Sequence, residues 1–216
     1  MIYSASKNFL FIHIPKTAGT SIRKLLEPYG GNPGILNFTA RRLESLRSLC
    51  KATQLYKFRT YDAHTRFDQV EKIIPANELN RCLKFCVVRN PYDRAVSFYH
   101  HILAHPEHPW FEKVKSFENF ASMALNFHKI GEPSQISYIK NSMNELAVDQ
   151  IIHFENLGSE FQDLCSRLSI GGSLTHSNRN KHRHWTEYYT EDVRKAVYSY
   201  YKEDFIKLGY PESIKI

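Results

Sequence analysis

The sequence predicts a three-layer α/β fold with a central parallel sheet flanked by helices. Three apolar runs, at residues 8–14, 83–89 and 148–154, have the length and composition of buried strands, and helical spacing follows each run. Strands that alternate with helices favour a parallel sheet. The length of 216 residues, with 42% hydrophobic and 24% charged residues, fits one globular domain. We therefore expect a single domain over residues 1–216.

The first strand and helix are defined by the run NFLFIHI and the segment after it. We expect the helix to begin near Gly19 or Thr20 and to end near Glu27, because Pro28 and the sequence YGGNPG stop it. The basic stretch at residues 40–51 has leucines in one stripe, which predicts a surface helix with solvated arginines.

The second strand, LKFCVVR, ends at a strong helix-start signal. Asn90 is a good N-cap and Pro91 is a good first helical residue, so a helix should run through YDRAVSFYHHILA. The third strand, VDQIIHF, should lead into a helix over about residues 156–168. The last helix should run from about Glu191 to Leu208, because Gly209 follows it with a proline behind.

The composition indicates an anionic ligand and a cytoplasmic protein. The formal net charge is +7 and the sequence pI is near 9.2, which favours anionic ligands or partners. The chain has neither a signal-peptide pattern nor a run of 18 apolar residues, so we expect no transmembrane segment. The cysteines show no CxxC pairing and read as reduced, buried thiols: Cys50, Cys82, Cys86 and Cys165.

The turn after the first strand, PKTAGTS, has the residues of an anion site. The first N–H groups of a helix have no helical partners, and the helix dipole adds positive charge there. Gly19 allows close approach of the backbone, Lys16 supplies a cation, and Thr17, Thr20 and Ser21 supply hydroxyls. An ordinary strand-to-helix turn with incidental polar residues is the alternative interpretation.

A nucleoside-triphosphate loop does not fit this turn. That loop has the pattern G-x-x-x-x-G-K-[ST], in which the lysine follows the second glycine. Here Lys16 precedes the only glycine, Gly19, by three residues. The order of residues therefore argues against a nucleotide or sugar kinase, which stays the main alternative function; the lack of an obvious carboxylate pair for Mg²⁺ also disfavours it.

A second anion-binding turn is predicted after the second strand. Arg89 stands at the carboxyl end of that strand, where open α/β sheets bind ligands, and Ser97 lies on the following helix. Pairing of Arg89 with a carboxylate is the alternative. Two such turns on neighbouring parallel strands indicate a ligand with two separated phosphate-like groups.

At these two turns the sequence resembles the sulfotransferases. HIPKTAGTS is similar to their 5′-phosphosulfate loop, and VVRNPYDRAVSFYHH to their 3′-phosphate segment, in the carbohydrate branch near the heparan sulfate 2-O- and chondroitin-type enzymes. SQISYI, IIHFENL and the segment at residues 178–210 resemble later blocks of the family in the same order. The resemblance implies a P-loop-NTPase-like fold. The membrane anchor of the Golgi members is absent here, which suggests a soluble, bacterial-type member.

The resemblance implies 3′-phosphoadenosine 5′-phosphosulfate (PAPS) as the donor, the bisphosphate PAP as the product, and no metal. Arg89 and Ser97 would bind the 3′-phosphate, and Lys181 would lie near the donor. Lys16 would also stabilise the charge that grows on the leaving phosphate. The 5′-phosphosulfate would be held by Lys16, Thr17, Ala18, Gly19, Thr20 and Ser21.

A histidine base completes the implied mechanism, because the acceptor hydroxyl must lose a proton. His64 occupies the position at which this branch carries its catalytic histidine, whereas an exposed loop histidine without a role is the alternative. His13, beside the phosphate loop, is the second candidate, although its alternation with Phe9 and Phe11 favours a packed strand histidine.

Several questions stay open at the level of sequence. The acceptor is expected to be a carbohydrate or glycolipid, and the basic balance suits an acidic one, whereas nucleic acid is not expected. A non-catalytic module that binds PAP or nucleic acid is a further alternative. Glu155 could orient a partner or stabilise a helix dipole. Zinc is disfavoured at the histidine cluster, which contains His100, His101, His105 and His108. The oligomeric state is not predicted.

Overall fold

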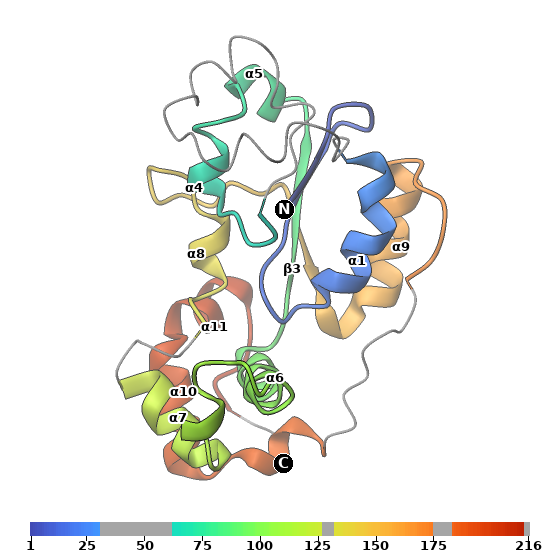
Figure 1. Ribbon diagram of the computed structural model, residues 1–216. Coiled ribbons are helices and arrows are strands. Elements are labelled where there is room, and N and C mark those ends of the chain that lie inside the picture. The colour runs from blue at the N-terminus through green and yellow to red at the C-terminus, as the bar shows by residue number, and fades with distance from the viewer. Residues whose placement is uncertain (31–61, 127–131, 175–182, 214–216) are drawn as a thin grey trace. The chain divides into compact units, whose positions relative to one another are not determined.

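The computed structural model describes residues 1–30, 62–126, 132–174 and 183–213 (Figure 1). The chain forms two compact units. Unit 1 contains Met1–Val88 and Ser137–Ser177, and unit 2 contains Arg89–Ile136 and Asn178–Ile216. The single domain over the whole chain stays a prediction, and the helix predicted at residues 40–51 lies outside the described residues.

Unit 1 is built on a four-stranded sheet with the order β1-β2-β3-β4. The strands are β1 (Ile2–Ser4), β2 (Phe9–Ile12), β3 (Leu83–Val88) and β4 (Gln150–His153). β2, β3 and β4 are the three predicted strands, and they pair in parallel, with Phe11 opposite Phe85 and Cys86 opposite Ile151. The sheet is nevertheless mixed, because β1 pairs antiparallel with β2 through a short turn that we did not predict.

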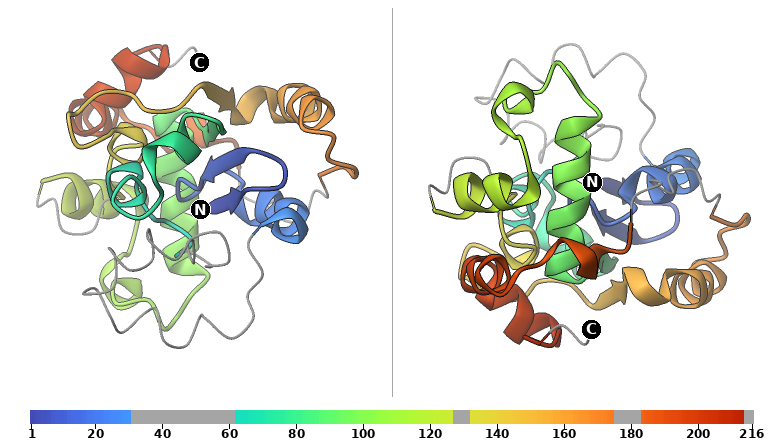
Figure 2. Two further views of the ribbon diagram at one scale, coloured as in Figure 1. Left: turned by 90° about the horizontal axis from the view of Figure 1, so that it is seen from above. Right: turned by 90° about the horizontal axis from the view of Figure 1, so that it is seen from below.

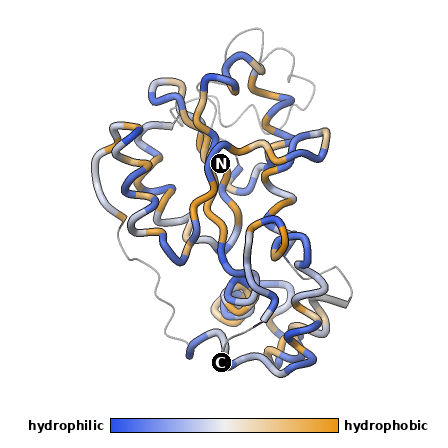
Figure 3. Tube along the Cα trace, turned by 180° about the vertical axis from the view of Figure 1, so that it is seen from behind, coloured by the Kyte–Doolittle hydropathy of each residue, from blue (hydrophilic) through white to orange (hydrophobic). Residues whose placement is uncertain are grey.

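Both faces of the sheet are covered, which explains the continuous apolar runs. All four residues of β2 are fully buried, as expected for a strand between two layers. Apolar residues concentrate along the strands, whereas polar and apolar residues alternate along the helices (Figure 3). Phe11 and Phe85 stack at 5.3 Å between ring centroids and lie in one apolar core with Ile22 and Leu164.

Helices lie on both sides of this sheet (Figures 1 and 2). On one side are α1 (Gly19–Leu26) and α9 (Leu157–Arg167), and on the other are α4 (Phe67–Val70) and α5 (Ala76–Leu79). The three-layer prediction is therefore confirmed for this unit. α1 ends as predicted, because a 3₁₀ turn containing Pro28 follows Leu26. The remaining short helix, α8, spans Ile136–Ile139.

Unit 2 is helical. Its helices are α6 (Pro91–Leu103), α7 (Phe117–Asn126), α10 (Glu191–Tyr200) and α11 (Lys202–Leu208), with 3₁₀ turns at Phe111–Lys113 and Trp185–Tyr188. A largely aromatic core joins them, including Tyr92, Tyr99, Phe120, Val197 and Phe205. Among the described residues, no helix is long and apolar enough to cross a membrane.

The ends of these helices follow local sequence signals with one exception. α6 begins as predicted, with the Asn90 side chain accepting the Tyr92 N–H at 3.0 Å and Pro91 in the first turn. The last predicted helix is two helices, because the backbone leaves helical geometry at the buried Tyr201 (φ −99°, ψ 21°). α11 then ends at Gly209 in the left-handed conformation (φ 73°), as the sequence predicts.

Candidate functional site

The turn between β2 and α1 has an unusual backbone. Lys16 (φ 68°) and Ala18 (φ 64°) both adopt the left-handed conformation, which residues with a Cβ rarely occupy. Strained positions of this kind cluster at functional sites. Turns that contain left-handed residues can bring successive backbone N–H groups to one side, which is the geometry of anion-binding concavities. The two left-handed residues are therefore compatible with the predicted phosphate loop.

The start of α1 is also suited to an anion. Ala18 is the N-cap and offers no side-chain cap, while its carbonyl accepts the Ser21 N–H at 3.1 Å. The first turn contains no acidic residue, so no side chain of its own neutralises the positive end of the helix dipole. Lys16 and Ser21 are half-buried beside this turn, and Thr20 is exposed.

Thr17 has a different place from its neighbours. Its hydroxyl donates to the Ile14 carbonyl at 2.9 Å, and the side chain is fully buried. The hydroxyl therefore stabilises the turn, whereas the predicted contact with a ligand would have to come from the Thr17 backbone. The turn does bring together the other predicted residues of the loop, which are Lys16, Ala18, Gly19, Thr20 and Ser21.

Gly19 is required by a packing contact that the sequence did not reveal. A Cβ at this position would overlap the imidazole of His13, whose Nε2 and Cδ2 atoms lie nearest. We had attributed the glycine to close approach of a ligand. The structure adds that the ring of His13, the first residue after β2, rests directly against the first residue of α1.

His13 is a buried, neutral histidine. Its side chain is 6% exposed, and its ring stacks on Phe11 at 5.8 Å between centroids. The pKa of His13 is lowered to about 2, mainly by burial. Smaller contributions come from the charges of His64, the Met1 amino group and Arg23. Its Nδ1 atom has no hydrogen-bond partner among the described residues. A buried polar atom without a partner beside the loop indicates a place where a ligand or water belongs.

His13 and His64 lie together in unit 1, although 50 residues of sequence separate them. Their ring centroids are 4.4 Å apart, and His64 is exposed whereas His13 is buried. The Nδ1 atom of His64 lies 3.2 Å from the His13 carbonyl oxygen. A carbonyl only accepts hydrogen bonds, so this contact places the proton of neutral His64 on Nδ1 and the lone pair on Nε2. The Asp62 carbonyl accepts the Thr65 hydroxyl at 2.9 Å and closes the turn that carries His64.

The second predicted turn lies in unit 2, at the start of α6. Arg89 forms a two-point ion pair with Asp93. Nε of Arg89 donates to Oδ2 at 2.7 Å, and Nη2 donates to Oδ1 at 2.8 Å. The carboxylate partner that we considered as an alternative is therefore present. Ser97 follows Asp93 by one helical turn and is 5% exposed. Asp93 was missed from the sequence, although its spacing of four from Arg89 could have indicated it.

The late basic and aromatic segment is described only from residue 183, so Lys181 lies outside the described residues. Arg183 stacks over the ring of Tyr188 at 4.2 Å, and Trp185 stacks on Tyr92 at 6.1 Å between centroids. These contacts belong to unit 2. These are packing contacts of aromatic rings. The contact of Lys181 with the donor stays a prediction.

The histidine cluster has local partners. His100 Nε2 lies 2.6 Å from the Tyr188 hydroxyl, and His105 Nδ1 lies 2.8 Å from Glu107. Ring centroids of His101 and His105 are 4.2 Å apart. In the part of the chain that the structure describes, no group of three or more His, Cys, Asp or Glu side chains could hold a metal ion.

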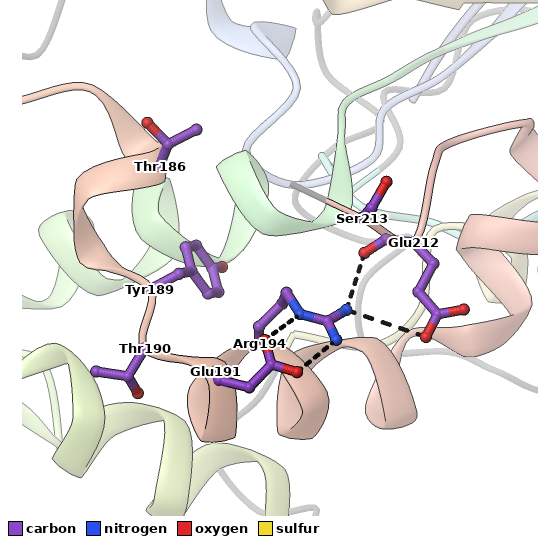
Figure 4. A pocket seen from close by; sticks show the side chains of 7 residues that line it. All are labelled: Thr186, Tyr189, Thr190, Glu191, Arg194, Glu212 and Ser213. Atoms are coloured by element: carbon purple, nitrogen blue, oxygen red, sulfur yellow. Dashed lines mark hydrogen bonds and ion pairs between the residues drawn. The ribbon is translucent and has the colours of Figure 1, made fainter. Parts of the chain in front are cut away.

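A pocket of about 680 Å³ lies within unit 2 (Figure 4). Arg194 crosses it and binds both carboxylate oxygens of Glu191 at 2.9 Å. The guanidinium also donates to the Glu212 carbonyl at 3.2 Å. The other lining residues are Thr186, Tyr189, Thr190 and Ser213. None of the predicted site residues that the structure describes lines this pocket.

Comparisons with known proteins identify the fold. The model of the sulfotransferase family matches residues 1–211. The mouse sulfotransferase SULT7A1, solved in complex with PAP, is similar in structure, with a TM-score of 0.54 and 16% identity over 94% of this chain and 86% of that one. A sulfotransferase from Alicyclobacillus acidocaldarius gives a TM-score of 0.47 and 16% identity over 93% of each chain. No curated protein matches the sequence.

Proposed function

We propose that this chain, which belongs to the sulfotransferase family, transfers a sulfuryl group from PAPS to a hydroxyl of a carbohydrate or glycolipid acceptor. The observation that supports this most is the loop before α1, whose left-handed Lys16 and Ala18 precede a helix start without an acidic residue. The structural relative that binds PAP supports the choice of donor nucleotide.

The loop would hold the 5′ end of the donor. Backbone N–H groups of residues 16–20, the ammonium of Lys16 and the hydroxyls of Thr20 and Ser21 supply donors of the kind that bind phosphate oxygens. PAPS would supply the activated sulfuryl group. Lys16 would stabilise the negative charge that grows on the leaving phosphate, an effect that can contribute about 3–4 kcal/mol to a barrier. In unit 2, Arg89 and Ser97 would bind the 3′-phosphate.

His64 would act as the general base. The His13 carbonyl holds the proton of His64 on Nδ1, so Nε2 carries the lone pair that accepts the acceptor's hydroxyl proton. The acceptor oxygen then forms a bond to sulfur while the bond from sulfur to the bridging oxygen breaks. The electron pair of that bond leaves with the nucleotide phosphate. His13 cannot share the role, because its pKa of about 2 makes it a very weak base.

Ligand-dependent thermal unfolding separates this function from a kinase. A ligand that binds only the folded state raises the unfolding temperature. We expect PAP to stabilise the full-length protein in the absence of Mg²⁺, and ATP with Mg²⁺ to stabilise it less. Labelled PAPS offered with a panel of carbohydrate and glycolipid acceptors would then identify the acceptor. Stabilisation by ATP with Mg²⁺ alone would exclude the proposal, and PAP binding without transfer to any acceptor would indicate a non-catalytic module.

A further inference from the structure

The backbone of Arg89 is held on both sides by one side chain. The Arg89 N–H donates to Oε1 of Gln135 at 2.9 Å, and Nε2 of Gln135 donates to the Arg89 carbonyl at 2.8 Å. Arg89 follows the last residue of β3, where the pairing of the sheet stops. The Gln135 amide therefore takes the place of a peptide group from a neighbouring strand. Gln135 itself is fully buried.

This arrangement requires an amide. The N–H of Arg89 needs an acceptor and its carbonyl needs a donor, and the two ends of a glutamine amide supply one of each. A glutamate in the same shape would offer no donor and would place a second oxygen against the Arg89 carbonyl. Leaving buried backbone groups without partners is costly, so the identity of residue 135 determines how well Arg89 is held.

Gln135 is itself fixed by buried charges. Its backbone N–H donates to Oδ2 of Asp204 at 2.8 Å, and the Ile136 N–H donates to Oδ1 of Asp204 at 3.0 Å. Asp204 lies on α11 and is fully buried. Arg94, on α6 and 1% exposed, donates to the Pro133 carbonyl at 3.0 Å. The segment that presents the amide to Arg89 is thus held by two helices of unit 2.

The side chain of Arg89 is held separately by Asp93, through the two contacts of the ion pair. Backbone and guanidinium of Arg89 are therefore both fixed, the first by Gln135 and the second by Asp93. Hydrogen bonds from a guanidinium to a phosphate depend steeply on distance and angle. A shift of the backbone at residue 89 would move the guanidinium with it.

We propose that Gln135 is a positioning residue that sets the preference of the enzyme for donor nucleotides carrying a 3′-phosphate. It acts through Arg89 and touches no reacting atom. The inference rests on the proposed function, in which Arg89 binds the 3′-phosphate. It goes beyond it by assigning the selectivity between 3′-phosphorylated and unphosphorylated nucleotides to a residue 46 positions further along the chain.

Calorimetric titration of the full chain with PAP and with adenosine 5′-phosphosulfate, which lacks the 3′-phosphate, tests the proposal. Gln135→Glu and Gln135→Leu should each weaken PAP binding about tenfold or more. Either change would shift the Arg89 backbone and so misalign the hydrogen bonds from its guanidinium to the charged 3′-phosphate. Binding of adenosine 5′-phosphosulfate should stay within about twofold, because that ligand makes no contact that depends on Arg89. Gln150→Glu is the matched control, because Gln150 also accepts from an arginine, Arg167, at 2.8 Å, but lies in unit 1.

A pH series with Gln135→Glu distinguishes a lost hydrogen bond from general damage. When the new carboxyl group is protonated, it offers one donor and one acceptor, as the amide does. The preference for PAP, taken relative to wild type at each pH, should therefore recover as the pH falls toward about 5. Equal losses for both ligands, or an unchanged preference, would overturn the role of Gln135. A wild-type protein without any preference for PAP would overturn the proposed donor as well.

Discussion

The imidazole of His13 occupies the space that a side chain on Gly19 would need. One buried contact therefore connects the first residue after β2 with the first residue of α1. It explains why the loop needs a glycine at a position whose backbone angles any residue could adopt, since Gly19 is not among the residues with positive φ. The contact predicts specific effects of substitution.

Gly19→Ala should destabilise the protein by roughly 1–3 kcal/mol and weaken PAP binding, because the new methyl group displaces the His13 ring. Urea unfolding and calorimetry measure the two effects. Gly158→Ala is the control, because Gly158 lies in helix α9 and a Cβ at this position would meet nothing within 4 Å. A second change, His13→Ser, should remove much of the cost of Gly19→Ala. Additive effects of the two changes would contradict the contact.

Ala18→Gly should stabilise the protein by roughly 0.5–1 kcal/mol, because glycine adopts φ near 64° without strain. The backbone N–H groups of the loop are unchanged, so PAP affinity should stay within about twofold. Ala76→Gly in helix α5 should instead destabilise the protein, because glycine at a helical position only makes the unfolded chain more flexible. Chemical unfolding of both variants decides the point, and a destabilised Ala18→Gly would contradict the left-handed conformation at residue 18.

Arg89→Ala should weaken binding of PAP by about tenfold or more, while binding of adenosine 5′-phosphosulfate changes little, since only PAP has a 3′-phosphate. The variant also breaks the ion pair with Asp93, so a control with the same structural loss is needed. Arg194→Ala breaks a comparable two-point pair with Glu191 in the same unit. If both ligands lose affinity equally in Arg89→Ala, the residue does not bind the 3′-phosphate.

His64→Ala should lower kcat by about 10² or more and leave PAP affinity within about twofold, because the base meets only the acceptor's proton. Lys16→Ala, by contrast, should lower turnover and also weaken PAPS binding, because in the proposed function Lys16 contacts the donor. In the pH profile of kcat/KM, the rise on the acidic side that comes from deprotonation of the base should disappear in His64→Ala. This rise is the acidic limb of the profile. His13 cannot produce such a limb near neutrality, since its pKa is about 2. Near-normal turnover of His64→Ala with the true acceptor would place the base elsewhere.

The stability of the protein should fall in acid because of His13. Its folded pKa of about 2 lies below the unfolded value of about 6.5, so the unfolded chain binds more protons between these values. The contribution of neutral His13 is complete above pH 6.5 and decreases as the pH falls, by up to about 1.4 kcal/mol per pH unit. Urea unfolding at several pH values measures the slope. His13→Gln should reduce it, and an equal slope in that variant would assign the acid sensitivity to other groups.

The sequence predicted those features that depend on neighbouring residues. The start of α6 follows from Asn90 and Pro91, and the end of α11 from Gly209, because caps are satisfied within one turn. The three parallel strands were visible because burial on both faces leaves a continuous apolar run. β1, with only three residues, is too short for such a pattern.

The features that were missed depend on residues far apart in the chain. The amide of Gln135 reaches Arg89 across 46 positions, and the ring of His64 reaches His13 across 51. No local spacing encodes either contact. The role of the Thr17 hydroxyl was missed for a different reason. Its partner, the Ile14 carbonyl, is only three residues away, but a hydroxyl in a loop can either face a ligand or close the loop.

The antiparallel strand β1 has a consequence for the behaviour of the protein at high concentration. It pairs with β2, so the strand that leads into the loop before α1 is internal to the sheet that the described residues form. The two outer strands, β1 and β4, have only three and four residues. Short outer strands are poor templates for pairing with another chain. Self-association by strand addition is thus disfavoured at both margins of the sheet, as far as the described residues form it.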